Sequence, residues 1–237
     1  MKELTFEGNK FIVYEDKDVK FVFSTAENGL NFNKSLPEGI ENLGRLKKWF
    51  DLKEVGYCNQ VHSDIIRIFE ENNKDGDALI TDSVNTAVGV FTADCVPVLL
   101  FDKENKIVAA VHSGWRGTVK NIVLKTVVKM ISGYGCKPEN IIAYFGPHNR
   151  QCCYEVGTEV MEEFESNEAF RNIDYIKDSN ISLVACITKQ LLEADLISEN
   201  INDVALCTFC SDEYKLHSYR KGQNNYGRMF SFIYLKD

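Results

Sequence analysis

Residues 96–112 read VPVLLFDKENKIVAAVH, and this stretch decides the fold because it holds two strand-like runs in close succession. Residues 96–101 and 107–112 are rich in Val, Ile, Leu and Phe, and the polar residues between them, centred on Glu104 and Asn105, mark a turn. The pattern predicts a hairpin. Such a hairpin would bring Cys95, just before the first strand, close to His112 at the end of the second.

Similar runs on both sides of the hairpin predict an α/β (α+β) protein. Strands are expected at residues 11–14, 20–24, 57–61, 64–69, 78–81, 87–91, 141–145, 203–208 and 229–235. Helices are expected after Thr118, which can cap the first one, and at residues 157–165 and 183–196, whereas residues 167–180 are expected to form a surface loop. We therefore expect a single layered domain over residues 1–237, with helices outside a mixed sheet.

Composition narrows the class of protein. The chain has 237 residues, of which 44% are apolar and 26% charged, so a disordered chain is excluded. The net charge is −8 and basic runs are short, which argues against a nucleic-acid partner. The N-terminus lacks a signal-peptide pattern, and no apolar run approaches the roughly 20 residues that span a membrane. The eight cysteines are therefore expected to be reduced thiols in a cytoplasmic protein.

Three potential metal ligands, His62, Cys95 and His112, lie next to strand ends. One cysteine and two histidines match a catalytic zinc site, in which three protein ligands leave a fourth position open. Two alternatives remain at this point. Cys95 could be a packed thiol beside two hydrogen-bonded histidines, or it could be a nucleophile activated by His112, with Asp94 or Gln60 orienting the base, as in a Cys-His hydrolase or deamidase.

Residues 113–118, SGWRGT, join a strand to a helix next to His112. The glycines allow the backbone to approach a ligand, and Arg116 offers a fork of donors suited to phosphate or carboxylate. The segment therefore predicts an anion pocket, and a tight turn with a surface arginine is the alternative. Arg220, Lys221 and Arg228 can add positive charge near the C-terminus.

The other cysteines and histidines carry weaker signals. Cys207 and Cys210 form a lone Cys-x-x-Cys without a second pair at zinc-finger spacing, so they are expected to be buried thiols. The adjacent Cys152 and Cys153 are expected to pack in the protein or line a pocket. His148 and His217 are not part of any recognisable pattern of metal-ligating or catalytic residues. Both are expected to be surface or structural residues.

Taken together, these segments resemble the laccase-domain, or YfiH-type, family, once called multicopper polyphenol oxidases. The match spans nearly the whole chain. The motifs that carry it occur in this order: NQVH (59–62), GDALIT (76–81), TADCVP (92–97), AVHSGWRGT (110–118), GP (146–147), CCYEVG (152–157), CT (207–208), SYR (218–220) and GRM (227–229).

The resemblance implies a YfiH-like fold and a zinc enzyme acting on small molecules. The implied activities are phosphorolysis of the purine nucleosides adenosine, inosine, guanosine and methylthioadenosine, together with adenosine deamination. The family's metal ligands map onto His62, Cys95 and His112, and Asp94 is a possible catalytic acid or base beside Cys95 and His112. Its polar substrate-binding residues map onto Asn31, Gln60, Ser113, Arg116 and Arg228.

The sequence departs from the family pattern in three places. Residues 24–29 read STAENG, where the family often has an arginine; if that arginine holds phosphate, another cation must replace it here. Lys221 stands in place of a second arginine, and His148 in place of isoleucine. Copper is a less favoured metal than zinc, because multicopper oxidases need many more histidines than the four present. A copper polyphenol oxidase and a non-enzymatic scaffold remain as alternatives.

Overall fold

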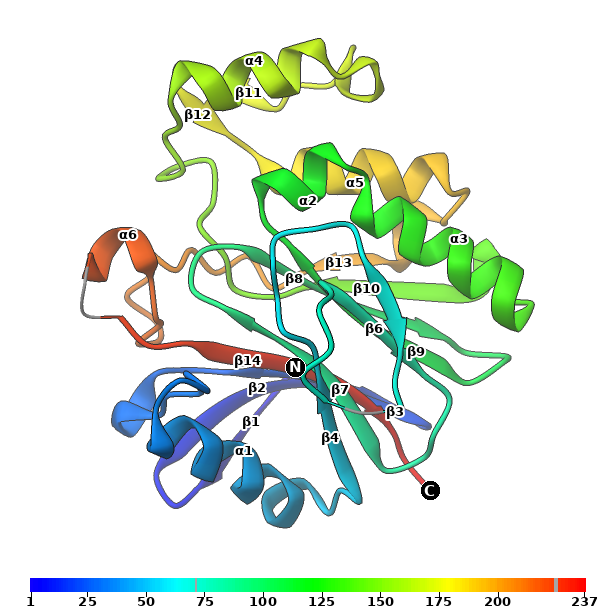
Figure 1. Ribbon diagram of the computed structural model, residues 1–237, viewed down its shortest axis with the longest axis vertical. Coiled ribbons are helices and arrows are strands. Elements are labelled where there is room, and N and C mark those ends of the chain that lie inside the picture. The colour runs from blue at the N-terminus through cyan, green and yellow to red at the C-terminus, as the bar shows by residue number, and fades with distance from the viewer. Residues whose placement is uncertain (71, 224–225) are drawn as a thin grey trace.

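Two mixed β-sheets stack face to face in the computed structural model, which describes residues 1–70, 72–223 and 226–237 (Figure 1). The first sheet has the order β1 (Lys2–Phe6), β2 (Asn9–Asp16), β3 (Val19–Ser24), β14 (Met229–Leu235), β7 (Thr86–Thr92) and β4 (Glu54–Tyr57). The second has the order β13 (Ile201–Asp203), β10 (Ile141–Phe145), β8 (Val96–Asp102), β9 (Ile107–Ser113), β6 (Ala78–Thr81) and β5 (Ile66–Ile68).

Helices cover the outer faces of both sheets. The helix α1 (Pro37–Phe50) packs its apolar side on the first sheet, and α3 (Ile122–Tyr134) and α5 (Leu183–Glu193) cover the second. The shorter helices α2 (Trp115–Val119), α4 (Thr158–Ser166) and α6 (Tyr219–Gly222) lie in the connections, as does the small ladder of β11 (Ile176–Lys177) and β12 (Asn180–Ile181). The layers therefore run helix, sheet, sheet, helix.

The predicted hairpin is present as β8 and β9, with Pro97 opposite His112. Both strands are buried along their whole length because each face of the second sheet is covered. Val98 and Leu100 pack toward α3 and α5, whereas Leu99 and Phe101 pack into the core between the two sheets. Burial on two faces explains why these strands are continuous apolar runs without alternation.

The predicted α/β (α+β) class is confirmed, with two mixed sheets in place of the single one expected. The strand expected at 57–61 is wrong beyond Tyr57, where β4 ends, and 203–208 is wrong beyond Asp203. The helix α1 was not predicted; its apolar residues bury one face of an otherwise polar helix. The cap assigned to Thr118 is also wrong, since this residue lies inside α2 and its hydroxyl bonds the carbonyl of Gly114.

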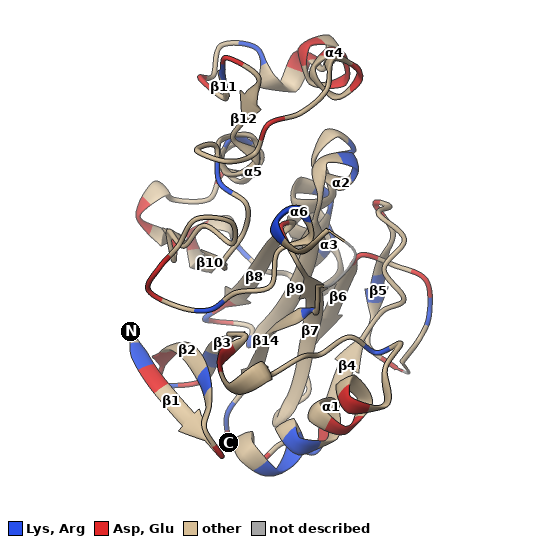
Figure 2. Ribbon diagram, turned by 90° about the vertical axis from the view of Figure 1, so that its left-hand side faces the viewer, with Lys and Arg blue, Asp and Glu red and all other residues tan. Residues whose placement is uncertain are grey.

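Charged side chains are dispersed over the molecule. Figure 2 shows acidic and basic residues interspersed on α1 and acidic residues along α4. No described helix combines the length and the apolar character needed to cross a membrane.

Candidate functional site

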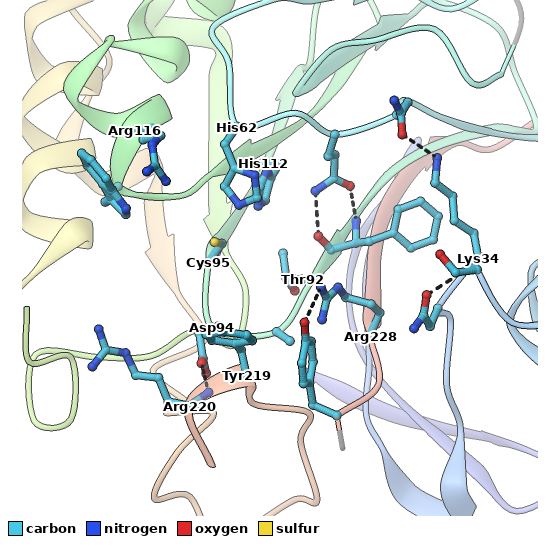
Figure 3. Close-up of a pocket in the computed structure, with 18 of the residues that line it drawn as sticks. Lys34, His62, Thr92, Asp94, Cys95, His112, Arg116, Tyr219, Arg220 and Arg228 are labelled. Atoms are coloured by element: carbon cyan, nitrogen blue, oxygen red, sulfur yellow. Dashed lines mark hydrogen bonds between the residues drawn. The ribbon is translucent and has the colours of Figure 1, made fainter. Parts of the chain in front are cut away.

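His62, Cys95 and His112 converge at one end of the sheets and form what we call the His–Cys–His site. One ligand atom from each lies within 4.8 Å of those of the other two. Figure 3 shows the three side chains pointing toward one another. The imidazole rings of the two histidines are 4.9 Å apart between centroids and nearly perpendicular. The structure thus brings together the three residues predicted as metal ligands.

The strands dictate this convergence. Cys95 directly precedes β8 and His112 is the next-to-last residue of β9, so the register of the hairpin places them side by side. His62 arrives on the loop between β4 and β5 with a left-handed backbone, φ 55°. Such a conformation is uncommon for residues other than glycine and must be held in place by the surroundings.

Asp77 supplies that constraint. Its carboxylate is 1% exposed and accepts hydrogen bonds from the backbone N–H groups of Val61, His62 and Ser63, and from the Ser63 hydroxyl. It also bonds Nδ1 of His112 at 2.8 Å. A carboxylate at Nδ1 fixes the proton there and leaves Nε2 free to bind a metal.

The residue that orients His112 is therefore Asp77, and the prediction that Asp94 or Gln60 does so is wrong. Gln60 instead bonds the backbone N–H and carbonyl of Phe91 through its side-chain amide. The sequence did contain a signal, since Asp77 stands in the GDALIT stretch immediately before a buried strand. Its partner could not be read from spacing because Asp77 and His112 are 35 residues apart.

The charges at the site are strongly coupled. Burial raises the pKa of the Cys95 thiol, but His112 and His62 outweigh it and bring that pKa down to about 6. Burial lowers the pKa of His112, whereas Cys95 and Asp77 raise it to about 9. Burial raises the pKa of Asp77, yet the hydrogen bonds from His112 and Ser63 bring it down to about 2. The lowered pKa of Cys95 favours its thiolate, which is the form that binds a metal.

Gly114 approaches this site too closely to carry a side chain. A Cβ there would meet Sγ of Cys95 at 2.9 Å and Cδ2 of His62 at 3.3 Å. The glycine of the SGWRGT segment is thus required by packing against two of the candidate ligands.

A pocket of about 840 Å³ opens beside the His–Cys–His site. All three predicted metal ligands, His62, Cys95 and His112, lie in its wall. The remaining wall residues are Asn33, Lys34, Ser35, Asn59, Gln60, Phe91, Thr92, Ala93, Asp94, Trp115, Arg116, Tyr154, Tyr219, Arg220, Tyr226 and Arg228. The wall therefore includes three of the five residues predicted to bind substrate, namely Gln60, Arg116 and Arg228.

Asn31 and Ser113 are not among the described residues that line the pocket. The Asn31 side chain accepts hydrogen bonds from the backbone N–H groups of Asn33 and Arg228. Ser113 is fully buried and bonds the hydroxyl of Thr118. Both hold pocket-bearing segments in place through these hydrogen bonds, and their contact with substrate stays a prediction.

Three arginines in the pocket wall each lie over an aromatic ring. The guanidinium of Arg116 is 4.3 Å from the ring centroid of Trp115, and that of Arg228 is 4.4 Å from Tyr226. Arg220, which was not predicted as a binding residue, is 4.8 Å from Tyr154. Cation–π contact restrains these side chains and leaves their N–H donors able to bind an anion.

Two polar side chains at the pocket, Asp94 and Thr92, differ in their hydrogen-bond partners. The carboxylate of Asp94 accepts hydrogen bonds from the Thr208 hydroxyl at 2.6 Å and the Arg220 backbone N–H at 2.8 Å. The hydroxyl of Thr92 is buried and has no partner among the described residues. A buried unpaired hydroxyl in a pocket wall is a natural partner for a ligand.

The two remaining histidines are structural, as expected. His148 is 2% exposed and its Nδ1 bonds the carbonyl of Gly146. His217 bonds the carbonyl of Leu30 and accepts the N–H of Gly227.

Residues 21–236 match the family model described as multi-copper polyphenol oxidoreductase laccase. The chain belongs to this laccase family. It is 50% identical to a purine nucleoside phosphorylase of Clostridium acetobutylicum over 96% of this chain and 98% of that protein. It is 34% identical to adenosine deaminase RL5, from an unknown prokaryotic organism, over 78% of this chain and 77% of that protein.

Solved structures agree with the assignment to the laccase family. The crystal structure of the hypothetical protein YfiH of Bacillus licheniformis covers 92% of this chain and 93% of its own length, with a TM-score of 0.83 and 26% identity. The family and the YfiH-like fold expected from the motifs are therefore confirmed.

Proposed function

We propose that this chain is a cytoplasmic zinc-dependent purine nucleoside phosphorylase that also deaminates adenosine. The observation that carries the proposal is the His–Cys–His site opening onto a pocket of about 840 Å³ with aromatic and arginine side chains in its wall. Support comes from relatives that are named for these two activities. We also propose that residues 1–237 fold as one domain, because the core between the sheets draws on strands from both ends of the chain.

The donor set fits zinc. Two imidazoles and one thiolate, with His112 held in one tautomer by Asp77, are the ligands of a three-residue catalytic zinc site. When bound, the ion would supply Lewis-acid chemistry. A multicopper centre fits less well, because His148 and His217 are engaged by backbone groups elsewhere.

The pocket offers separate partners for a base and for phosphate. Aromatic rings of Tyr154, Tyr219 and Trp115 can pack against a purine, and the unpaired hydroxyl of Thr92 can bond it. Arg116 and Arg228 are the proposed phosphate ligands, since guanidinium groups bind phosphate through paired donors. They would replace the arginine that is missing from residues 24–29.

We assign Asp94 a positioning role in place of acid–base catalysis. Both of its carboxylate oxygens accept hydrogen bonds, from the Thr208 hydroxyl and from the backbone N–H of Arg220. It therefore fixes the segment that carries Arg220 against the loop before β8. His112 and Cys95 remain the groups that can hold or release a proton nearest the pocket.

The test is product analysis with purified protein and adenosine, with and without phosphate. Phosphorolysis would convert adenosine and phosphate into adenine and ribose 1-phosphate, and deamination would convert adenosine and water into inosine and ammonia. We expect adenine only with phosphate present, and inosine under both conditions. His62→Ala is the matched negative control for contaminating enzymes. Absence of all these products from protein that contains zinc would overturn the proposal.

One further function is favoured by a specific observation. Cys95, His112 and Asp77 form a hydrogen-bonded series of nucleophile, base and orienting carboxylate, the arrangement of a cysteine hydrolase. Metal analysis separates the two functions. A metal-free protein that is active and loses its activity on alkylation of Cys95 would support the hydrolase, and one zinc bound at the His–Cys–His site would support the phosphorylase.

A further inference from the structure

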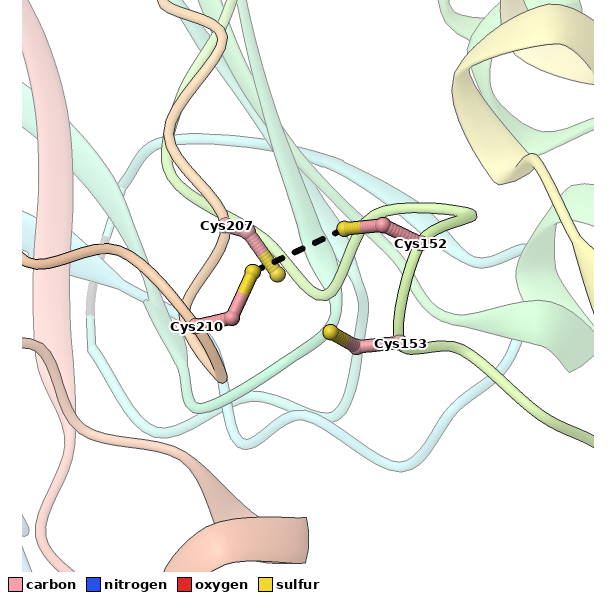
Figure 4. Close-up of side chains that lie close together, drawn as sticks. All are labelled: Cys152, Cys153, Cys207 and Cys210. Atoms are coloured by element: carbon pink, nitrogen blue, oxygen red, sulfur yellow. Dashed lines mark hydrogen bonds between the residues drawn. The ribbon is translucent and has the colours of Figure 1, made fainter.

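Four cysteines from two separate loops meet at a second place in the molecule. Cys152 and Cys153 lie between β10 and α4, and Cys207 and Cys210 lie between β13 and α6. Their sulfur atoms all lie within 4.8 Å of one another. Figure 4 shows the four side chains close together. We call this group the four-cysteine cluster. The expectation that Cys207 and Cys210 are simply buried thiols is wrong for Cys210, which is exposed, as is Cys152.

The spacing of the sulfurs suits a metal ion. Four thiolates around a tetrahedral zinc, with Zn–S bonds of about 2.3 Å, have sulfurs about 3.8 Å apart. The sulfurs of Cys152 and Cys210 are 3.7 Å apart. A disulfide needs about 2 Å, and the cysteines of the cluster are free thiols.

The backbone around Cys207 is arranged to hold a thiolate. The backbone N–H groups of Arg150, Phe209 and Cys210 donate hydrogen bonds to the sulfur of Cys207. Two of these donors come from the Cys-x-x-Cys turn itself, which folds back over its first sulfur. Hydrogen bonds of this kind orient and stabilise metal-bound thiolates.

Asn149 provides an independent sign that the cluster is built for a charged sulfur. Its side chain is 1% exposed, its Oδ1 lies 3.9 Å from Sγ of Cys207, and its Nδ2 has no partner among the described residues. The oxygen and nitrogen of an amide are exchanged by a half-turn of the group. After that turn the unpaired N–H₂ would donate to the Cys207 thiolate.

We propose that the four-cysteine cluster binds one Zn²⁺ through Cys152, Cys153, Cys207 and Cys210, as a closed structural site separate from the His–Cys–His site. Soft thiolate ligands in a tetrahedral set select zinc, and four protein ligands leave no open position for substrate. The protons of the thiols are released to solvent on binding. The exposed Cys152 and Cys210 give the ion a path of entry.

The position of the four-cysteine cluster indicates the structural role of the bound ion. The loop that bears Cys152 and Cys153 continues into Tyr154, a pocket residue, and Thr208 between the other two cysteines bonds Asp94. Backbone hydrogen bonds of His148 with Leu206 and Thr208 and the ion pair of Arg150 with Asp203 also join these segments. The zinc would therefore tie together two loops that build one side of the pocket.

The first test counts zinc per chain, by elemental analysis, in protein purified with reductant and without chelator. We expect two in the wild type, one in Cys210→Ser, one in Cys152→Ser and two in Cys186→Ala, a matched buried cysteine outside the cluster. His62→Ala separately removes the zinc of the His–Cys–His site. The loss of one zinc between the wild type and Cys210→Ser is therefore expected whether or not the His–Cys–His site holds a metal. A zinc content that Cys210→Ser and Cys152→Ser leave unchanged would overturn the proposal.

A second measurement does not depend on the folding of variants. Metal-free wild type is titrated with Co²⁺, and a tetrahedral four-thiolate site gives intense visible absorption that an equal amount of Zn²⁺ removes. We expect this band in wild type and in His62→Ala. Thiol titration of denatured, unreduced protein with chelator should find eight free thiols. Absence of the band, or four thiols lost to two disulfides, would overturn the proposal.

Discussion

The His–Cys–His site and the four-cysteine cluster are built in opposite ways. The ligands of the first come from strand ends in the buried second sheet and from a loop anchored on the buried Asp77. The ligands of the second come from two loops, and two of them are exposed. The first has three ligands and faces a pocket, and the second has four.

This difference teaches what each set of ligands is suited to do. Strands covered on both faces hold side chains to a fixed geometry without help from a metal, which suits a site that must leave one position open. Loops have fewer contacts to hold them, so a metal bound there contributes to the fold itself. The hydrogen bond from the Thr208 hydroxyl to Asp94, a residue of the pocket wall, connects the two regions.

The largest expected difference between the two regions comes from two single variants, each of which exchanges one cysteine for serine. Cys95→Ser should reduce kcat/KM for adenosine by more than about 100-fold, because loss of a direct ligand costs more than loss of a supporting residue. Cys210→Ser should change kcat/KM by less than about threefold at 25 °C while lowering the thermal midpoint. Steady-state kinetics and thermal unfolding measure both. Equal losses of kcat/KM in the two variants would contradict the assignment of a catalytic role to the His–Cys–His site and a structural role to the four-cysteine cluster.

Asp77→Asn should weaken metal binding by about 10–100-fold, the usual cost of removing a carboxylate behind a ligating histidine. The amide no longer attracts the proton of His112 Nδ1 and accepts fewer of the N–H bonds of residues 61–63. The measurement is zinc affinity by competition with a chelator, with kcat at saturating zinc as a second readout. Asp102→Asn, a buried carboxylate remote from both regions, is the control. Unchanged zinc affinity in Asp77→Asn would contradict the positioning role.

The same contrast explains what could be predicted from the sequence. The bounds of strands 78–81, 141–145 and 229–235 were predicted correctly at both ends. Short continuous apolar runs bounded by turns are seldom compatible with any other secondary structure. The convergence of His62, Cys95 and His112 could be predicted because the strand ends and the family motifs agree. The four-cysteine cluster was missed because it joins positions 152–153 to 207–210 through loops, whose paths no periodicity encodes.

Asp77 and α1 were missed for related reasons. Asp77 acts through backbone N–H groups, which every residue except proline carries, so no residue type marks its partners. The segment Pro37–Phe50 has a proline at its start and two glycines within it, and helix propensity alone disfavours glycine. Burial of Leu43, Leu46 and Trp49 against the first sheet overrides that local preference.

A more modest effect is expected from crowding the His–Cys–His site. Gly114→Ala places a Cβ 2.9 Å from Sγ of Cys95, so the ligand must shift by a few tenths of an ångström. We expect zinc affinity to fall about tenfold, in line with overpacking costs of about 1–3 kcal/mol. Gly44→Ala is the matched control, because a Cβ added there on α1 would meet nothing within 4 Å and the helix should gain stability. If both variants bind zinc like the wild type, the close packing of Gly114 is not a constraint on the ligands.

The smallest effect should come from removing the surface ion pair that links the loop of His62 to α3. Asp64 on this loop forms an ion pair with Lys125 of α3, and both side chains are partly exposed. Exposed ion pairs contribute less than about 1 kcal/mol and are screened by salt. Lys125→Met should therefore lower the free energy of unfolding slightly, like the matched Lys47→Met, which removes the exposed pair with Glu54 on the first sheet. Zinc affinity should stay within about twofold of the wild type, because the buried carboxylate of Asp77 fixes the backbone of residues 61–63. A tenfold loss of zinc affinity in Lys125→Met but not in Lys47→Met would instead show that the surface ion pair with Asp64 helps to hold the loop of His62 rigid.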